Sequence, residues 1–420
     1  MTDSRRIWIT GLGLVTPIGT GVDAFRDGLR RATSPVMRID RFDPSPFRSQ
    51  VAAQVDDFDP LTWMPPKTAR QLDRFSQFGM VAGKLALEDA SMRPGERGAP
   101  DPDRVGIYLG SALGGIAFAE EQHERYMEKG IRQVSPTLAL AVFGGAAPAN
   151  LGIELGVRGP ILSTANSCAS GGVALGEALG DLRAGRVDAA IAGGCEIPLS
   201  PLAFGAFDII RALSAGHNDD PSHAARPFDA GRDGFVMGEG AALLVLEDAE
   251  AAERRGATPY AELLGYGATS DAHHMVQPRS DGREAARATS IALDDADVEA
   301  GEIDYVNAHA SSTPIGDAAE ARALTMALGE RAASVPVSGT KALYGHPLGA
   351  SGAIEAAICA LTIRDGWAPA SVNLDQPEPE VDGLLPGLLR AGRDGSYRRV
   401  LSTSFGFGGL NAALVFGGVD

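Results

Sequence analysis

Short apolar segments that mostly end in glycine recur along this chain, and they constrain its fold more than any other feature. Four of them lie at residues 7–11 (IWITG), 105–110 (VGIYLG), 189–194 (AAIAGG) and 241–246 (AALLVL). Each has the length and composition of a buried strand. Alanine-rich stretches with helical spacing lie between them, for example residues 172–183 and 354–364. This alternation predicts an α/β fold with parallel central strands.

The chain also contains weak internal repeats. Three pairs of segments match in the same order: 168–173 (CASGGV) with 349–354 (GASGAI), 240–243 with 411–414, and 108–110 with 307–309. The alternative explanation is chance similarity between alanine- and glycine-rich helices. We interpret the repeats as two duplicated α/β halves, residues 1–253 and 254–420, which meet near the charged stretch 247–255. Equivalent loops of two such halves would converge on one site.

The composition excludes several classes of protein. The 420 residues are 44% hydrophobic and 22% charged, enough for a large core. A net charge of −17 argues against a nucleic-acid partner. The apolar stretch at residues 7–9 is too short for a signal peptide, and no stretch approaches the roughly 18 apolar residues of a membrane span. We therefore expect a soluble, cytoplasmic protein that does not act at a membrane.

One of the three cysteines lies where a nucleophile is expected. Cys168 follows a polar turn (STANS) and precedes an alanine-rich helix. The dipole and free N–H groups of a helix N-terminus can lower a thiol pKa from about 8.5 toward neutrality. Cys195 and Cys359 lie in strand-like and helical patterns that suit packing, and no spacing resembles a disulfide framework or a zinc site.

Two histidines lie in loops similar to that of Cys168. His309 directly follows an expected strand, and His346 precedes the second repeated helix. A nucleophile with two neutral hydrogen-bond donors can stabilise a developing enolate and its oxyanion. Lys341 could tune such a site electrostatically or hold a carboxylate, with Glu320 as its partner. The alternative for that pair is an ordinary surface salt bridge.

A glycine-dense turn near the C-terminus could complete the site. Residues 403–411 (TSFGFGGLN) can aim a backbone N–H at a substrate carbonyl, with Phe407 covering the pocket. The glycines at residues 11, 13 and 19 lack the spacing of a dinucleotide-binding loop, so we expect no nucleotide site there.

Together these motifs resemble the 3-ketoacyl-[acyl-carrier-protein] synthases, in their elongating Cys-His-His branch within the thiolase superfamily. The resemblance covers nearly the whole chain and rests on five ordered stretches: residues 6–19, 226–235, 307–317, 341–355 and 404–411. It implies a five-layer αβαβα sandwich, a homodimer, and no metal or organic cofactor. A heterodimer with a chain-length-factor-like paralogue is the alternative assembly.

The resemblance also implies a two-stage reaction. Cys168 would take an acyl chain from acyl-carrier protein, and malonyl-carrier protein would then lose carbon dioxide and attack the acyl-cysteine. His309 and His346 would assist decarboxylation, and an ion pair between Lys341 and Glu320 would order the site. The backbone N–H groups of Cys168 and Phe407 would form the oxyanion hole, and the Phe407 ring would control substrate order.

Further residues follow from the resemblance. It implies an acyl tunnel lined by Leu113 and by Leu138 near the dimer interface. It also implies a basic docking patch for the carrier protein, formed by Lys67, Arg70, Arg132 and Arg211.

Three departures concern the substrate rather than the chemistry. Ala310, Tyr344 and Leu410 stand where the family usually has Gly, Thr and Thr. The cargo could therefore be a fatty acid or a polyketide or polyene intermediate. A thiolase would carry a second cysteine in the C-terminal turn, and a non-catalytic partner subunit would lose the nucleophile. An acyltransferase that uses Cys168 without decarboxylation is the remaining alternative.

Overall fold

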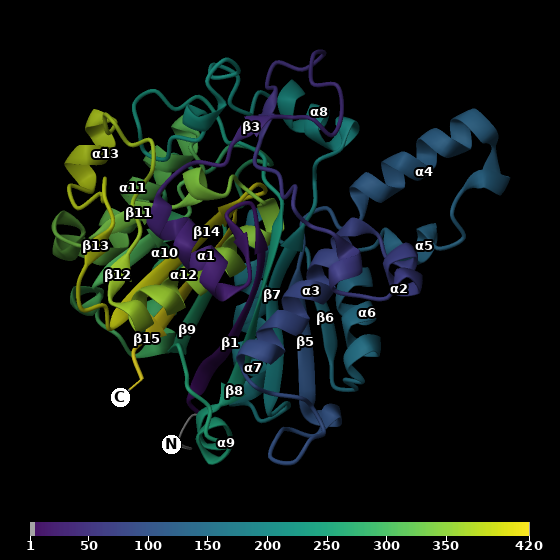
Figure 1. The fold of residues 1–420 in the computed structure, drawn as a ribbon. Helices are drawn as coiled ribbons and strands as arrows, with labels where there is room; N and C mark the ends of the chain where they lie inside the picture. The colour runs from purple at the N-terminus through teal and green to yellow at the C-terminus, as the bar shows by residue number, and fades with distance from the viewer. Residues whose placement is uncertain (1–4, 420) are drawn as a thin grey trace.

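A large mixed sheet runs through the protein, as the computed structural model in Figure 1 shows; the structure describes residues 5–419. The strand order is β11-β10-β14-β15-β9-β1-β8-β7-β5-β6, with the short β2 (Gly19–Thr20) beside β1. The first half of the chain supplies β1 (Ile7–Thr16), β5 (Val105–Gly110), β6 (Ile161–Thr164), β7 (Ala189–Glu196) and β8 (Gly240–Asp248). The second half supplies β9 (Ala261–Ser270), β10 (Tyr305–Ala308), β11 (Val337–Gly339), β14 (Arg399–Gly406) and β15 (Leu410–Gly417).

The two halves of the sheet have the same pairing pattern. β5 pairs in parallel with β6 and β7, and β8 runs antiparallel to β7 and β1. Likewise, β10 pairs in parallel with β11 and β14, and β15 runs antiparallel to β14 and β9. The three repeated segments occupy equivalent places in this pattern, which confirms the expected duplicated α/β architecture. The predicted boundary falls in α9 (Ala249–Arg254), between β8 and β9.

Helices cover the two halves in layers. α7 (Ser170–Arg183) and α12 (Ser351–Asp365) contact each other and strands of both halves, so they form the central layer. α3 (Arg74–Asp89) and α6 (Ala146–Leu155) cover the outer face of the first half. α10 (Arg283–Ala296) and α11 (Pro314–Leu328) cover the outer face of the second half. The result is the expected αβαβα sandwich.

The sequence of the central layer follows from this burial. α12 is buried on all sides from Ser351 to Thr362, so it cannot show the polar face of a surface helix. A Cβ atom added at Gly352 would lie 2.8 Å from the backbone nitrogen of Gly172 on α7. The two helices therefore need small residues where they cross.

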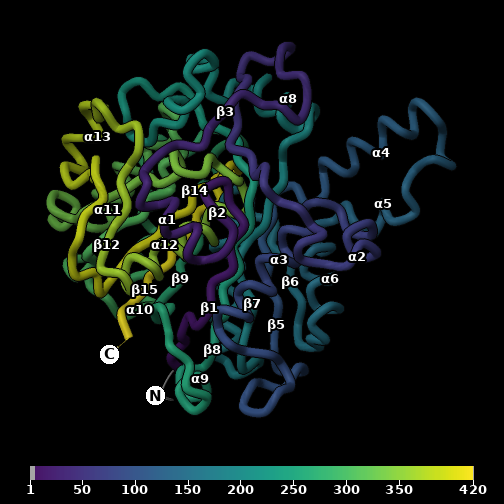
Figure 2. Tube along the Cα trace, in the orientation of Figure 1, coloured from purple at the N-terminus to yellow at the C-terminus, as the bar shows by residue number. Residues whose placement is uncertain are grey.

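The remaining elements decorate this frame. Between β2 and α3 the chain forms α1 (Val22–Arg31), β3 (Met37–Arg38), β4 (Val51–Ala52) and α2 (Pro66–Gln71), and α8 (Pro201–Ile209) lies above the sheet. α4 (Ile116–Lys129) and α5 (Leu138–Ala141) project from the side that carries β6 (Figures 1 and 2). β12 (Trp367–Ala368), α13 (Pro379–Leu384) and β13 (Arg393–Asp394) complete the second half. Within residues 5–419, no helix has the length and apolar character required to cross a membrane.

Candidate active site

Cys168 lies in a tight turn between β6 and α7. The turn forms a short 3₁₀ helix, Ser167–Ala169, and Ser167 has a left-handed backbone with φ of 54°. The Ser170 hydroxyl fixes this turn, because it donates to the Ser167 carbonyl (2.6 Å) and accepts from the Asn166 N–H (2.8 Å). The cysteine therefore stands at the N-terminus of α7, as predicted, but it is buried.

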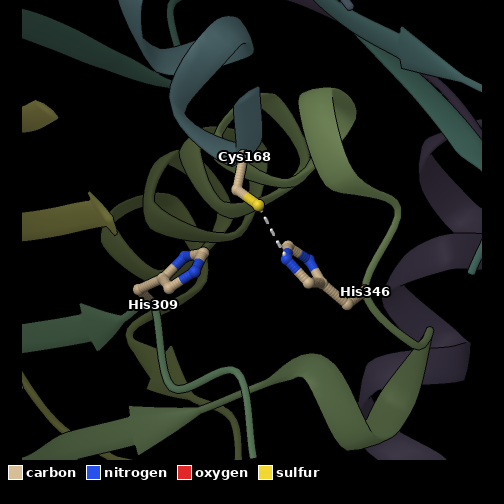
Figure 3. A group of neighbouring side chains, drawn as sticks. All are labelled: Cys168, His309 and His346. Carbon is tan, nitrogen blue, oxygen red and sulfur yellow. Dashed lines mark hydrogen bonds between the residues drawn. The ribbon is translucent and has the colours of Figure 1, made fainter. Parts of the chain in front are cut away.

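His346 approaches the thiol from the second half of the chain. Its Nε2 lies 3.1 Å from Cys168 Sγ, as Figure 3 shows, and its Nδ1 lies 2.8 Å from the Ser351 hydroxyl on α12. The His346 backbone N–H donates to the Val236 carbonyl at 2.7 Å. The Ser351 contact and the backbone hydrogen bond therefore hold the imidazole in place with its Nε2 against the sulfur.

His309 completes the group and lies directly after β10. Its ring centroid is 5.3 Å from that of His346, and the two planes meet at 81° (Figure 3). The Glu320 carboxylate on α11 accepts from the backbone N–H groups of His309 (2.8 Å) and Ala310 (2.7 Å). Thr403 donates to the same carboxylate at 2.7 Å. Glu320 thus fixes the turn that carries His309.

Lys341 sets the tautomer of His309. Its buried Nζ lies 3.3 Å from His309 Nδ1, and it also donates to the His309 carbonyl. An ammonium group has only donors, so Nδ1 must accept and the imidazole proton must reside on Nε2. His309 therefore presents a donor on its far ring nitrogen.

The predicted ion pair between Lys341 and Glu320 is wrong. Lys341 pairs instead with Glu355 on α12. The reason is that Glu320 is occupied by the backbone N–H groups of the His309 turn, while α12 brings Glu355 beside the ammonium group. Glu320 acts on the same site through the backbone.

Both histidines are held neutral. Burial lowers the pKa of His309 and of His346 well below the usual range, and the nearby Lys341 charge lowers both further. Neutral imidazoles can donate hydrogen bonds to a developing negative charge without carrying a charge themselves.

The expected low pKa of Cys168 is wrong. Burial raises the pKa of the thiol, and this outweighs the opposing effects of the Ser167 hydroxyl, the Lys341 charge and the Phe407 backbone N–H. Cys168 is therefore a neutral thiol beside a neutral imidazole at rest, and its proton must move when the sulfur attacks.

Phe407 lies in the turn between β14 and β15. Its backbone N–H points at the Cys168 sulfur, and its ring stacks on Phe207 with centroids 6.1 Å apart. A pocket of about 370 Å³ is lined by Phe407 and by all three of Cys168, His309 and His346. Its lining is predominantly apolar, which suits an acyl chain.

The residues predicted for the acyl tunnel and for carrier-protein docking do not all lie at this pocket. Leu113 packs in the hydrophobic cluster that contains Cys168, whereas Leu138 begins α5 and does not line the pocket. Arg211 is exposed and lines the pocket. Lys67 and Arg70 are exposed on α2, and Arg132 is exposed after α4, so these three are separate from the pocket lining.

Two buried acids were not predicted from the sequence. Glu355 is the partner of Lys341, and burial raises its pKa to about 7. Glu196, at the end of β7, accepts from the backbone N–H groups of Leu113 (3.1 Å) and Gly349 (3.0 Å), so it joins the loop beside Cys168 to the start of α12. Each is the single acid in a segment of small apolar residues, and that was the available signal.

The group formed by Cys168, His309 and His346 has the donor types of a metal site. Ligand atoms of Cys168, His309 and His346 lie within 4.8 Å of one another. However, the ammonium group of Lys341 already lies against His309, and its charge disfavours a second cation. The arrangement suits acyl chemistry better than metal binding.

Comparisons with known proteins agree with the geometry. Residues 4–252 match the beta-ketoacyl synthase N-terminal domain, and residues 260–375 match the C-terminal domain. The chain is 40% identical to 3-oxoacyl-[acyl-carrier-protein] synthase 2 of Staphylococcus aureus (strain COL), with 99% of each chain covered. It is 41% identical to the Vibrio harveyi enzyme of the same name, with 98% of each covered.

Solved structures of ketosynthases have the same fold as this chain. One is described as a type II PKS acyl-carrier protein in complex with its ketosynthase bound to the hexaketide; it matches with a TM-score of 0.90 and 31% identity, covering 99% of this chain and 100% of that one. The ishigamide ketosynthase/chain length factor matches with a TM-score of 0.90 and 32% identity over the full length of both chains. The resemblance inferred from the motifs is confirmed, and this chain belongs to the beta-ketoacyl synthase family.

Proposed function

We propose that this chain is a 3-oxoacyl-[acyl-carrier-protein] synthase that carries its acyl chain on Cys168. The observation that carries the proposal is the 3.1 Å contact between Cys168 Sγ and His346 Nε2 in an apolar pocket that His309 also lines. Family membership and the activity named for the full-length relatives support it.

In the first stage, Cys168 Sγ attacks the thioester carbonyl of an acyl-carrier protein. The new S–C bond replaces the bond to the carrier thiol, which leaves with the cysteine proton. His346 Nε2 is placed to relay that proton. The backbone N–H groups of Cys168 and Phe407 would hold the oxyanion of the tetrahedral intermediate, since the Phe407 N–H already points at the sulfur.

In the second stage, malonyl-carrier protein loses carbon dioxide. The electrons of the broken C–C bond enter an enolate, whose oxygen accepts hydrogen bonds from His309 Nε2–H and from His346 Nε2–H. For this stage the His346 proton would reside on Nε2, with the Ser351 hydroxyl donating to Nδ1. The resulting carbanion attacks the acyl-cysteine carbonyl, and collapse of that intermediate releases 3-ketoacyl-carrier protein. The Cys168 thiolate takes up one proton to restore the resting enzyme.

A two-step experiment tests this proposal. The purified protein is incubated with acyl-carrier protein, and the acyl adduct is located by mass spectrometry. Malonyl-carrier protein is then added, and carbon dioxide and 3-ketoacyl product are measured. We expect an adduct on Cys168, followed by both products.

The Cys168→Gln variant separates the two stages. It should lose condensation but retain measurable malonyl decarboxylation, because the histidines perform that step. Cys195→Ala is the matched control, since Cys195 is buried in β7 and should be dispensable for both stages. An adduct without carbon dioxide release would favour simple acyl transfer, and absence of any adduct on Cys168 would refute the nucleophile.

The carrier protein would dock at the mouth of the pocket. Arg211 is the docking candidate supported by position, because it is exposed and lines that pocket. An acidic carrier needs a local cation on an enzyme with a net charge of −17. Arg211→Glu should raise the KM for the carrier protein, whereas an unchanged KM would refute this contact. Lys67, Arg70 and Arg132 would contribute more remote contacts.

The cargo is a fatty-acid or polyketide intermediate. Relatives named for fatty-acid chemistry and neighbours named for polyketide chemistry support the two options. Leu113 would limit the length of the acyl chain, because it packs in the cluster around Cys168. Leu138 would reach the tunnel only from the α4–α5 projection of a second subunit.

The enzyme would act as a homodimer. β6 ends the sheet, and Ile161 and Leu162 on it are exposed. Ile153 on the neighbouring α6 and Phe143 just before it extend this apolar surface. A second copy related by a two-fold axis would cover the same residues on both chains.

A further inference from the structure

The Tyr344 side chain reaches into the buried network behind the two histidines. Tyr344 lies two residues before His346 and is fully buried. Its hydroxyl lies 2.9 Å from Thr340 Oγ1 and donates to Glu355 Oε1 at 3.4 Å. A threonine at this position would be too short to fill the same volume and to place a hydroxyl at the position of the phenol oxygen.

The oxygen that accepts from Tyr344 is the one that pairs with Lys341. Lys341 in turn donates to the His309 carbonyl and lies 3.3 Å from His309 Nδ1. The phenol, the Glu355 carboxylate, the ammonium group and the imidazole therefore form one continuous chain of contacts. Movement of the carboxylate would move Lys341 away from His309.

We propose that Tyr344 is a positioning residue for decarboxylation, because its phenol holds the Glu355 carboxylate against Lys341 and so keeps Lys341 directed at His309. This inference rests on the proposed function, which assigns decarboxylation to the histidines. Tyr344 does not touch the reacting atoms.

Protonation of Glu355 would break its ion pair with Lys341, so the role of Tyr344 can be followed in the pH profile of decarboxylation. Burial raises the pKa of Glu355 to about 7, the Lys341 charge and the hydrogen bonds from Lys341 and Tyr344 lower it, and Glu320 on α11 raises it. Cys359, one turn along α12, and His309 are the other ionisable neighbours. Burial raises the pKa of Cys359 and lowers that of His309, so both are held neutral. The Lys341–Glu355 pair is intact above the pKa of Glu355 and is lost as the pH falls through it.

Removal of the phenol oxygen should therefore move this loss to higher pH. We would measure malonyl-carrier decarboxylation between pH 5.5 and 9 for the full-length enzyme and for Tyr344→Phe. The acid limb should shift upward by about half to one pH unit.

Tyr305→Phe is the matched control. Tyr305 is equally buried, and its hydroxyl lies 2.7 Å from Ser338 Oγ and accepts from Asn307 at 3.3 Å, but it does not contact Glu355. Its profile should coincide with that of the wild type. A second test is Glu355→Gln, which removes the titrating group: addition of Tyr344→Phe to that variant should not shift the profile further.

The outcomes are distinct. A Tyr344→Phe profile identical to the wild type, or an equal shift in Tyr305→Phe, would overturn the inference. An acid limb that Tyr344→Phe still shifts in the Glu355→Gln background would do the same. Failure of the wild-type enzyme to release carbon dioxide would instead refute the proposed function on which the inference depends. Thermal unfolding of each variant separates loss of fold from loss of position.

Discussion

The Lys341 ammonium group lies against His309, and its surroundings decide what that charge does. Glu355 compensates it on one side, while His309 offers its carbonyl and Nδ1 on the other. A single buried ammonium group thus fixes a tautomer and adds to the effect of burial in lowering the pKa of both histidines. It also opposes, without outweighing, the burial that raises the pKa of Cys168. Truncation of Lys341 would leave a buried carboxylate without its partner, which is more costly than loss of a surface ion pair.

The Lys341→Ala variant should lose decarboxylation activity by about a hundredfold, because His309 would no longer be held with its proton on Nε2. The measurement is the rate of carbon dioxide release from malonyl-carrier protein on the alkaline plateau. Lys84→Ala is the control, since Lys84 pairs with Glu154 on the outer layer and should have no effect. A loss of less than threefold in a folded Lys341→Ala protein would contradict the assigned role of Lys341.

At the level of elements, the sequence predicted what is local and missed what depends on burial. The turn before α7, the loops of His309 and His346, and the two repeated helices could all be located, because glycine, polar and apolar residues mark them within a few positions. The partner of Lys341 could not, since Glu320 and Glu355 both lie in helical patterns and only the packing of α12 decides between them. The prediction of a low pKa for Cys168 failed for a similar reason. The helix N-terminus can be seen in the sequence, but the burial that raises the pKa cannot.

The crossing of α7 and α12 gives a test of packing at this scale. Gly352→Ala would place a Cβ atom 2.8 Å from both Gly172 N and Ser404 Oγ, so one helix must move away. We expect a loss of about 1–3 kcal/mol of stability, measured as the shift in denaturant midpoint. The matched control is Gly180→Ala, at an exposed position of α7 where the added Cβ atom meets nothing within 4 Å. This substitution should be neutral or should stabilise the protein by up to about 1 kcal/mol. Equal effects of the two substitutions would show that helix propensity, and not the crossing, sets the response.

For the whole molecule, the two ends of the sheet differ. The outer edge of β11 is covered, because Val337 exchanges backbone hydrogen bonds with Gly387 and Leu389. In the part of the chain that the structure describes, β6 pairs only with β5, and its side chains are exposed on both faces. An open apolar edge favours association, and the turn that carries Cys168 follows shortly after it. The proposed dimer contact would therefore lie only a few residues along the chain from Cys168.

Substitution of Leu162 tests this coupling. Leu162 is 42% exposed, and an aspartate there would place a charge in the contact of each subunit with the other. We expect Leu162→Asp to convert a species of twice the chain mass into monomers, as measured by sedimentation, and to lower condensation activity, because the turn that carries Cys168 loses its support. Met326→Asp is the control: Met326 is 54% exposed on α11, at the far end of the sheet, and its substitution should change neither mass nor activity. A Leu162→Asp protein that stays dimeric would place the interface elsewhere, and monomers with full activity would separate assembly from the site.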